Sequence, residues 1–435
     1  MAEKIHKFTN IMNEKIKQAD DTYIKRINKD KNGNIINKLF FKDVLYSCVH
    51  NLSDSIDTVV GTLKNDCNKT VTKNAIDKRR NQISTSIHIR DLNDSLTHEI
   101  YDPDNNFIIP NNFKIDRNKK SFIRNTSSKI DQSLYINSSN KRFIGVDGSQ
   151  LNVNKALING IDIKSSKNGL YGVCMISGMY DVLNRIPINF QLIESSEEDF
   201  HKKKFNETKG FLDQMDRVDN NDVLVFDRLY FSYALHKKLT DDDIGYIFRM
   251  KNNSKLFRGM GMGKSKLTDI NGVNVQLFKY KIKEELYCIL TSITDNISIP
   301  EIKSLYWLRW NIETDFRKLK YDILTNYSPA LTYNSLMTRL ESLRFMSLLS
   351  SFVEYAGLKK TPVNKKINSK NCIKILYKCL LHSLIYNIRK KARIDRNIKI
   401  IFATLVEIIK NRSYDRVRKS PSTKWNAKGN RYGNG

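Results

Sequence analysis

The sequence predicts a mixed α/β domain in the middle of the chain, with helical regions before and after it. Short apolar runs typical of buried strands, such as FIGVD and VLVFD, cluster between residues 142 and 297. Helical patterns lie between these runs, which is the order expected of a mixed α/β fold. The flanking segments are polar and carry apolar residues at helical spacing. A chain of 435 residues is long enough for two or three domains.

Residues 1–103 are predicted to be helical. Three short helices, the last one basic, are expected within residues 37–83, and they resemble a helix-turn-helix unit. On this interpretation the DNA-binding residues of the last helix are Lys73, Lys78, Arg79 and Arg80. The alternative is an ordinary helical subdomain with a solvated basic face.

Residues 104–141 are rich in Asn, Ser, Lys and Pro without a sustained period, which indicates a polar linker. The strands and helices of residues 142–325 then form the mixed α/β domain. Within it, residues 252–297 alternate like a hairpin and are predicted to be a small β insertion. Residues 326–435 are expected to be helical and to end in a basic tail.

The formal net charge of +28 points to a polyanionic partner, with nucleic acid as the leading candidate. The alternative is an AT-rich genome, which inflates Lys and Asn without selection for binding. The six cysteines and seven histidines show no zinc-binding spacing. No apolar run approaches the ~18 residues of a membrane span, and the N-terminus has no signal-peptide core. We therefore expect no membrane partner and an intracellular location, in the cytoplasm and nucleoid or in the nucleus according to the host.

Two of the predicted strands end in aspartate, at Asp147 and Asp227. A carboxylate at the margin of a buried sheet needs a cation or a hydrogen-bond donor, because leaving it bare costs several kcal/mol. Hard divalent metal ions prefer such oxygen ligands. For either residue alone, a turn or a helix cap is the competing interpretation.

The segment SLYWLRWNIETDFRKLKYDI, residues 304–323, is predicted to be one helix. At ~100° per residue, positions 306, 309, 313, 316 and 320 fall within an arc of about 80°. Four of them carry polar groups: Tyr306, Arg309, Glu313 and Lys320. An adjacent apolar stripe is suited to docking on the sheet. Glu313 would then join Asp147 and Asp227 in a set able to hold two Mg²⁺ ions about 3.5–4 Å apart.

Other side chains of this helix are suited to contacting DNA. Arg309 and Lys320 would contact phosphates beside the metal ions. Trp307 and Trp310 are suited to stacking on bases that have left the duplex, with packing in the core as the alternative.

The pattern Tyr306-x₂-Arg309-x₃-Glu313-x₆-Lys320 resembles the signature of cut-and-paste insertion-sequence transposases of insertion-sequence family four. Two further segments are similar to the aspartate strands of that family: IGVDGSQL around Asp147, and VLVFDRLYFS, where Arg228 follows Asp227. The resemblance covers residues 140–425 and includes the basic tail.

The resemblance implies an RNase H-like catalytic domain with a β insertion between the second aspartate and the glutamate. It implies a transposase that cuts DNA at transposon ends and joins the freed 3′-hydroxyls to a target. The implied cofactor is Mg²⁺, with Mn²⁺ as a substitute. The implied partners are the terminal inverted repeats, the target DNA and a second protomer. Two alternatives stay open: a catalytically inactive, transposase-derived DNA-binding protein, and a general two-metal nuclease.

Overall fold

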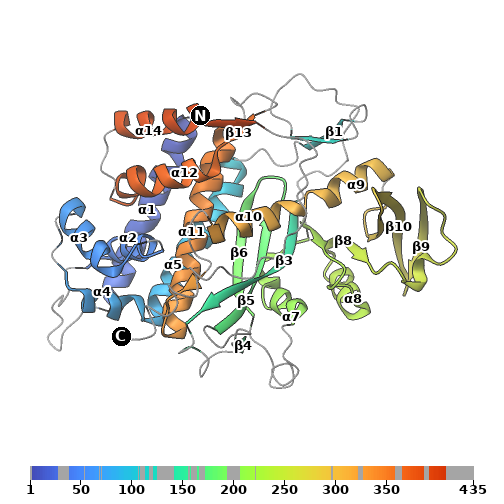
Figure 1. The fold of residues 1–435 in the computed structure, drawn as a ribbon, viewed down its shortest axis with the longest axis horizontal. Coiled ribbons are helices and arrows are strands. Elements are labelled where there is room, and N and C mark those ends of the chain that lie inside the picture. Colours follow the sequence, from blue (N-terminus) through green and yellow to red (C-terminus); the bar gives the residue numbers. More distant parts are fainter. Residues whose placement is uncertain are drawn as a thin grey trace.

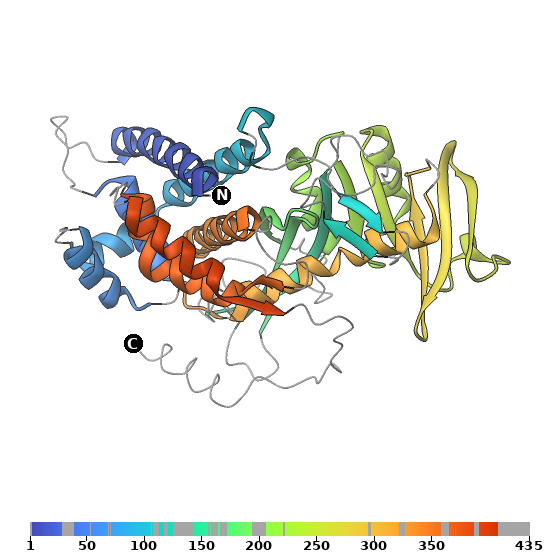
Figure 2. The same cartoon turned by 90° about the horizontal axis from the view of Figure 1, so that it is seen from above.

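The structure is a computed structural model. It describes residues 2–27, 39–52, 54–67, 69, 71–105, 107, 113–116, 121–124, 142–154, 157, 164–165, 172–193, 206–220, 222–294, 297–321, 327–357, 365–386 and 391–407. Helices gather at one end of the molecule, and a long sheet extends from them to the other end (Figures 1 and 2). The basic tail, 408–435, and most of the predicted linker lie outside the described residues.

The central sheet has the strand order β4-β5-β3-β7-β8-β11-β10-β9, with β6 paired to β5 and β12 paired to β3. Strands β3, β7 and β8 run parallel, whereas β5 is antiparallel to both β3 and β6. This is the mixed order of an RNase H-like sheet, so the predicted fold class is confirmed. The strands are β3 (Arg142–Val153), β4 (Lys164–Ser165), β5 (Gly172–Asp181), β6 (Ile186–Leu192), β7 (Asp222–Phe226), β8 (Gly245–Met250), β9 (Lys264–Ile270), β10 (Val273–Ile282), β11 (Glu285–Thr291) and β12 (Tyr327–Ser328).

Both faces of the sheet are covered, which explains the unbroken apolar run of β7. Val223 and Val225 face one hydrophobic core together with α10 (Trp310–Tyr321) and α11 (Tyr333–Gly357). Leu224 and Phe226 face a second core with α7 (Glu207–Leu212) and α8 (Tyr233–Asp241). A strand buried on both sides has no polar face and therefore no alternation.

Residues 252–297, expected as a small β insertion, contain β9, β10 and β11. Strand β11 pairs antiparallel with β8, Cys288 opposite Met250, so these strands continue the central sheet. A tight turn at Lys283, whose φ is +53°, joins β10 to β11.

The helices before and after the sheet pack together around α11 (Figure 2). Arg344 Nη2 of α11 lies 2.8 Å from Asp94 Oδ1, and Asn93 Nδ2 donates to the Glu341 carbonyl at 2.9 Å. These bonds join helices that are about 250 residues apart in the sequence. The remaining helices are α1 (Ala2–Ile27), α2 (Phe41–His50), α3 (Ile56–Cys67), α4 (Lys73–Arg80), α5 (Ile83–Tyr101), α9 (Ile299–Trp307), α12 (Ser369–Ile375), α13 (Leu381–Ile385) and α14 (Lys391–Ala403).

Two small antiparallel strand pairs lie outside the central sheet. Strands β1 (Phe113–Asp116) and β2 (Ser121–Arg124) form a hairpin within the predicted linker, and β13 (Lys365–Ile367) pairs with β14 (Leu405–Glu407). Within the described ranges, none of the helices combines the length and the apolar character that a membrane span requires.

The predicted helix over residues 304–323 is wrong in one respect, because it is two helices. A tight turn at Leu308 and Arg309 separates α9 from α10. The Arg309 N–H donates to the Tyr306 carbonyl at 3.1 Å, and the Ile312 N–H donates to the Arg309 carbonyl at 3.0 Å. These bonds span three residues rather than four, which tightens the backbone here.

Glycines in β3 and β5 let α10 lie close to the sheet. A Cβ atom added to Gly178 would come within 2.6 Å of Phe316 Cζ, and one added to Gly145 within 3.7 Å of Ile312 Cγ2. Ile312, Phe316 and Leu319 are all buried, so the predicted apolar stripe does dock on the sheet. The absence of a side chain at Gly178 therefore lets the Phe316 ring of α10 lie against β5.

We expect Gly178→Ala to destabilise the protein by about 1–3 kcal/mol, because the new methyl group would overlap the Phe316 ring. Adding Phe316→Leu should recover part of this loss, so the double variant should lose less than the sum of the single variants. Urea unfolding measures both effects. Gly61→Ala in α3 is the control, since a Cβ there meets nothing within 4 Å. An equal response at Gly61 and Gly178 would contradict the packing argument.

Candidate active site

Asp147 and Asp227 lie side by side because β3 and β7 are parallel and in register. Val146 pairs with Phe226, and each aspartate is the next residue along its strand. Strand β7 ends at Phe226, whereas β3 continues to Val153. The prediction that Asp147 ends its strand is therefore wrong, because pairing with β5 carries β3 onward. The end of β7 is what leaves an open edge at this point of the sheet.

Arg309 lies among the three predicted carboxylates. Its Nη2 donates to Glu313 Oε1 at 2.9 Å, and its Nη1 lies 3.5 Å from Asp147 Oδ2. Only 3% of Arg309 is exposed. Burial disfavours the charged form, but Tyr306, Asp147, Asp227 and Glu313 together hold the pKa of the guanidinium above its usual value. The carboxylates and the arginine thus balance one another in a poorly solvated place.

Asp147 has the most perturbed carboxyl group of the set. Burial raises the pKa of Asp147 to about 7; Arg309 opposes the rise, while Glu313 and Glu207 add to it. The Gly148 N–H donates to Asp147 Oδ1 at 3.0 Å and fixes the orientation of the side chain. A carboxyl group with this pKa gains or loses a proton near neutrality, according to the charge placed beside it.

Tyr306 connects Asp227 to the strands of the insertion. Its hydroxyl donates to Asp227 Oδ1 at 3.4 Å, and its ring centroid lies 6.1 Å from that of Tyr287 on β11. Tyr287 stacks on Tyr280 with ring centroids 5.4 Å apart, and the Arg249 guanidinium lies 4.3 Å above the Tyr287 ring. The strands after β8 therefore support one side of the candidate site.

Glu207 is a fourth carboxylate, which the sequence analysis did not identify. It is the first residue of α7, and an added Cβ on Gly148 would lie 2.9 Å from its Cδ. Burial raises the pKa of Glu207, and the charge of Asp227 raises it further. An acidic residue in the first turn of a helix is ordinary in any sequence. Nothing in the pattern therefore distinguished Glu207 from a capping residue.

The predicted DNA-contacting residues near the carboxylates differ in exposure. Trp307 is 58% exposed, whereas Trp310 is half-buried beneath the Arg309 guanidinium, which lies 5.7 Å from its ring. Arg228 is exposed beside Asp227. Lys320 belongs to α10, but its side chain lies outside the described part of the structure.

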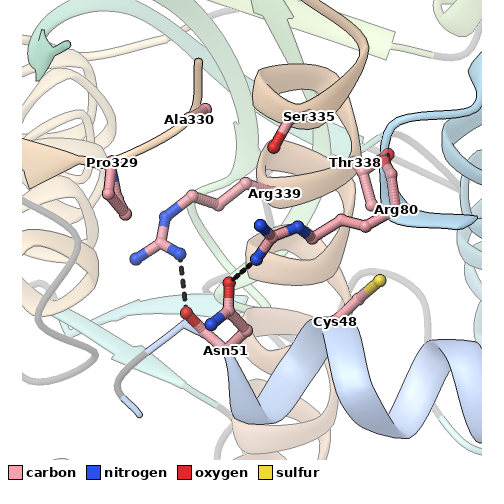
Figure 3. Close-up of a pocket in the computed structure, with 8 residues that line it drawn as sticks. All are labelled: Cys48, Asn51, Arg80, Pro329, Ala330, Ser335, Thr338 and Arg339. Atoms are coloured by element: carbon pink, nitrogen blue, oxygen red, sulfur yellow. Dashed lines mark hydrogen bonds between the residues drawn. The ribbon is translucent and has the colours of Figure 1, made fainter. Parts of the chain in front are cut away.

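The basic residues of α4 divide into two pairs. Lys73 and Lys78 are exposed, whereas Arg79 is 6% exposed. Arg80 points into a small pocket, where it bonds to Asn51 Oδ1 and lies near Arg339 (Figure 3). The prediction that Arg79 and Arg80 face a DNA groove is not met, because both guanidinium groups are used inside the helical region.

The side chains in the pocket of Figure 3 hold helices together, and Arg339 is the main example. It donates from Nη1 and Nη2 to the Asn51 and Leu52 carbonyls, both at 2.7 Å. These carbonyls lie at the C-terminal end of α2, where helix carbonyls lack helical partners. Arg339 therefore ties α11 to α2, and Arg80 bonds to the same turn.

The carboxylate set offers oxygen donors of the kind that Mg²⁺ and Mn²⁺ take, so its chemistry fits a divalent ion. Among the described residues, no three His, Cys, Asp or Glu side chains are already grouped as a metal-binding cluster. Arg309 instead supplies the positive charge between Asp147 and Glu313.

The fold and this site define an RNase H-like domain with an Asp-Asp-Glu set at the open edge of its sheet. Residues 138–346, a little under half of the chain, match the family model described as Transposase DDE domain. All three acidic residues lie inside the match. This segment is therefore similar to a transposase DDE domain.

Among solved structures, the chain is similar to piggyBac transposase, in a cryo-EM structure of its synaptic complex with hairpin DNA. The two chains are 13% identical, with a TM-score of 0.39 over 94% of this chain and 86% of that chain. A TM-score this low carries no conclusion about function. No curated protein matches the chain.

We expect Arg309→Met to cost about 3–5 kcal/mol of stability, because it leaves buried carboxylates without their counter-charge. Urea unfolding of the metal-free protein measures the loss. Lys237→Met is the matched control, since Lys237 pairs with Asp241 at 3.0 Å on an exposed helix. Such exposed pairs contribute about 0–1 kcal/mol. A loss at Arg309 no larger than at Lys237 would show that the arginine does not hold the set together.

Proposed function

We propose that this protein is a DNA transposase that cuts at transposon ends and joins the freed 3′-hydroxyls to target DNA. The observation that carries the proposal is the buried Arg309, which bonds to Glu313 at 2.9 Å and lies 3.5 Å from Asp147, while Asp227 follows the neighbouring parallel strand in register with Asp147. The matched DDE domain and the net charge of +28 support it.

In this proposal Asp147, Asp227 and Glu313 would hold Mg²⁺, which when bound activates a water or a 3′-hydroxyl and stabilises the leaving oxygen. The Tyr306 hydroxyl orients Asp227, and the Gly148 N–H orients Asp147. Arg309 offers planar donors that fit a phosphate oxygen once the scissile strand enters. Its charge is therefore already beside the reacting phosphate when DNA binds.

Exposed side chains around the carboxylates are suited to guide the DNA. The exposed ring of Trp307 can stack on a base, and Arg228 lies next to Asp227 to meet a phosphate. Lys320 is proposed for the same role, and Lys73 and Lys78 for contacts with the transposon end. The proposed partners are terminal inverted repeats, target DNA and a second copy of the chain.

We expect Asp227→Asn and Glu313→Gln each to reduce Mg²⁺-dependent cleavage by more than about a hundredfold. Loss of an outer-shell partner alone costs ten- to a hundredfold, and these residues would bind the metal directly. The measurement is strand cleavage of a plasmid that carries the DNA flanking the gene. DNA binding without metal should persist in both variants. Full cleavage by either variant would refute the proposed centre.

The same assay separates the two alternatives. A wild-type protein that binds DNA and never cuts it would be an inactive, transposase-derived binding protein. One that cuts without joining ends to a target plasmid would be a two-metal nuclease. Joined products favour the transposase.

We also propose that Glu207 assists the carboxylate set. Glu207→Gln should raise the Mg²⁺ concentration needed for half-maximal cleavage, while Glu207→Asp should restore part of the activity. Because burial raises the pKa of Glu207, its ionised form opposes folding at neutral pH, so Glu207→Gln should not lower the melting temperature. If Glu207→Gln left the Mg²⁺ concentration for half-maximal cleavage unchanged, the role of Glu207 would be confined to the first turn of α7.

A further inference from the structure

A polar pocket of about 390 Å³ lies on the other flank of α10 from the carboxylates. It is bounded by α10, the later half of α11, the β5–β6 turn and the segment from β13 into α12. At ~100° per residue, Asn311, Asp315 and Lys318 lie about 140–200° around α10 from Glu313. The same helix thus separates two polar sites.

The floor of this pocket carries Lys318 together with two acidic side chains, Glu354 and Asp315. Lys318 Nζ lies 2.7 Å from Glu354 Oε1, and the Ser369 hydroxyl donates to Glu354 Oε2 at 2.9 Å. Asp315 lies beside the buried Tyr180 and Lys318; burial raises the pKa of Asp315 to about 6. Lys318 is therefore already paired with acidic side chains and is not free to attract an anionic ligand.

The rim of the pocket differs from its floor, because several positively charged side chains lie there. Arg185, Arg317, Lys366 and Lys370 line the pocket and are exposed. No ion pair joins any of them to an acidic residue within the described ranges. Partial burial lowers the pKa of Lys366; Arg185 and Arg317 lower it as well, whereas Glu354 and Asp315 oppose the shift.

Arg185 has an unusual backbone. Its φ is +59°, in the region that favours glycine, and its N–H closes the β5–β6 turn by donating to the Asp181 carbonyl at 2.7 Å. A non-glycine residue pays about 1–2 kcal/mol for this conformation. A charged side chain is therefore present at the pocket mouth despite a local conformational cost.

We propose that this pocket binds the phosphodiester backbone of DNA, and that it does so a few nucleotides from the phosphate held at the carboxylates. This inference rests on the proposed function. Guanidinium groups match phosphate oxygens, and several cations on one rim suit successive phosphates. A helix is about 10–12 Å across and successive phosphates advance about 3.4 Å, so DNA that reaches both flanks would span about three nucleotides.

The test is a double variant, Arg185→Gly with Arg317→Ala, made in the full-length chain. Glycine suits the positive φ at 185 and alanine suits the helix surface at 317, so the fold should survive. Fluorescence anisotropy with a 30-base-pair duplex of arbitrary sequence measures affinity across a series of KCl concentrations. The buffer contains EDTA, so the result does not depend on cleavage.

We expect the double variant to bind more weakly, with the slope of log affinity against log salt shallower by about two. Lys283→Gly with Lys237→Ala is the matched control, because it removes two exposed charges, one of them also at a positive φ of +53°. An unchanged slope in the double variant, or an equal change in the control, would overturn the proposal. Absence of cleavage by the wild-type protein would instead count against the proposed function and leave the slope comparison intact.

Discussion

The candidate site depends on one buried positive charge. Arg309 is almost fully enclosed, and a guanidinium in such a place is tolerable only with carboxylates around it. The reverse also holds, because Asp147 and Glu313 are close enough to repel each other without it. The turn between α9 and α10, the end of β7 and the approach of α10 to the sheet all serve this arrangement. The turn positions Arg309, the end of β7 positions Asp227, and α10 positions Glu313.

Spacing along the sequence predicted much of this set. Two apolar runs that end in aspartate indicated neighbouring strands, and helical periodicity placed Arg309 and Glu313 on one line. Spacing along the sequence does not predict how deeply a side chain is buried. Side chains on one line of a helix can face solvent, a groove or a core, and Gly178 leaves the room in which Phe316 of α10 lies against the sheet. For this reason the spacing predicted Arg309 as a phosphate contact but did not predict that its guanidinium is a buried counter-charge to Asp147 and Glu313.

The features that the sequence did not reveal share a physical reason, which is that they arise between distant segments. Glu207 looked like any acidic residue at a helix start until α7 was placed over Gly148. Arg79 and Arg80 looked like a basic recognition surface until α2 and α11 enclosed them. The break at Leu308 has no glycine or proline to mark it. In each case tertiary contacts overrode a local pattern that was itself sound.

The position of α10 connects the two polar regions of the molecule. One flank carries Glu313 into the carboxylate set, and the other carries Lys318 to its partner Glu354 on α11. Because α11 also bonds to α2 and α5, it joins the helical body to α10, which packs on the sheet. The helical body also bonds to the sheet directly, since the Tyr101 hydroxyl of α5 donates to Asp181 Oδ2 of β5 at 2.6 Å. Glu313 on α10 is therefore held in place by contacts with both the sheet and the helical body.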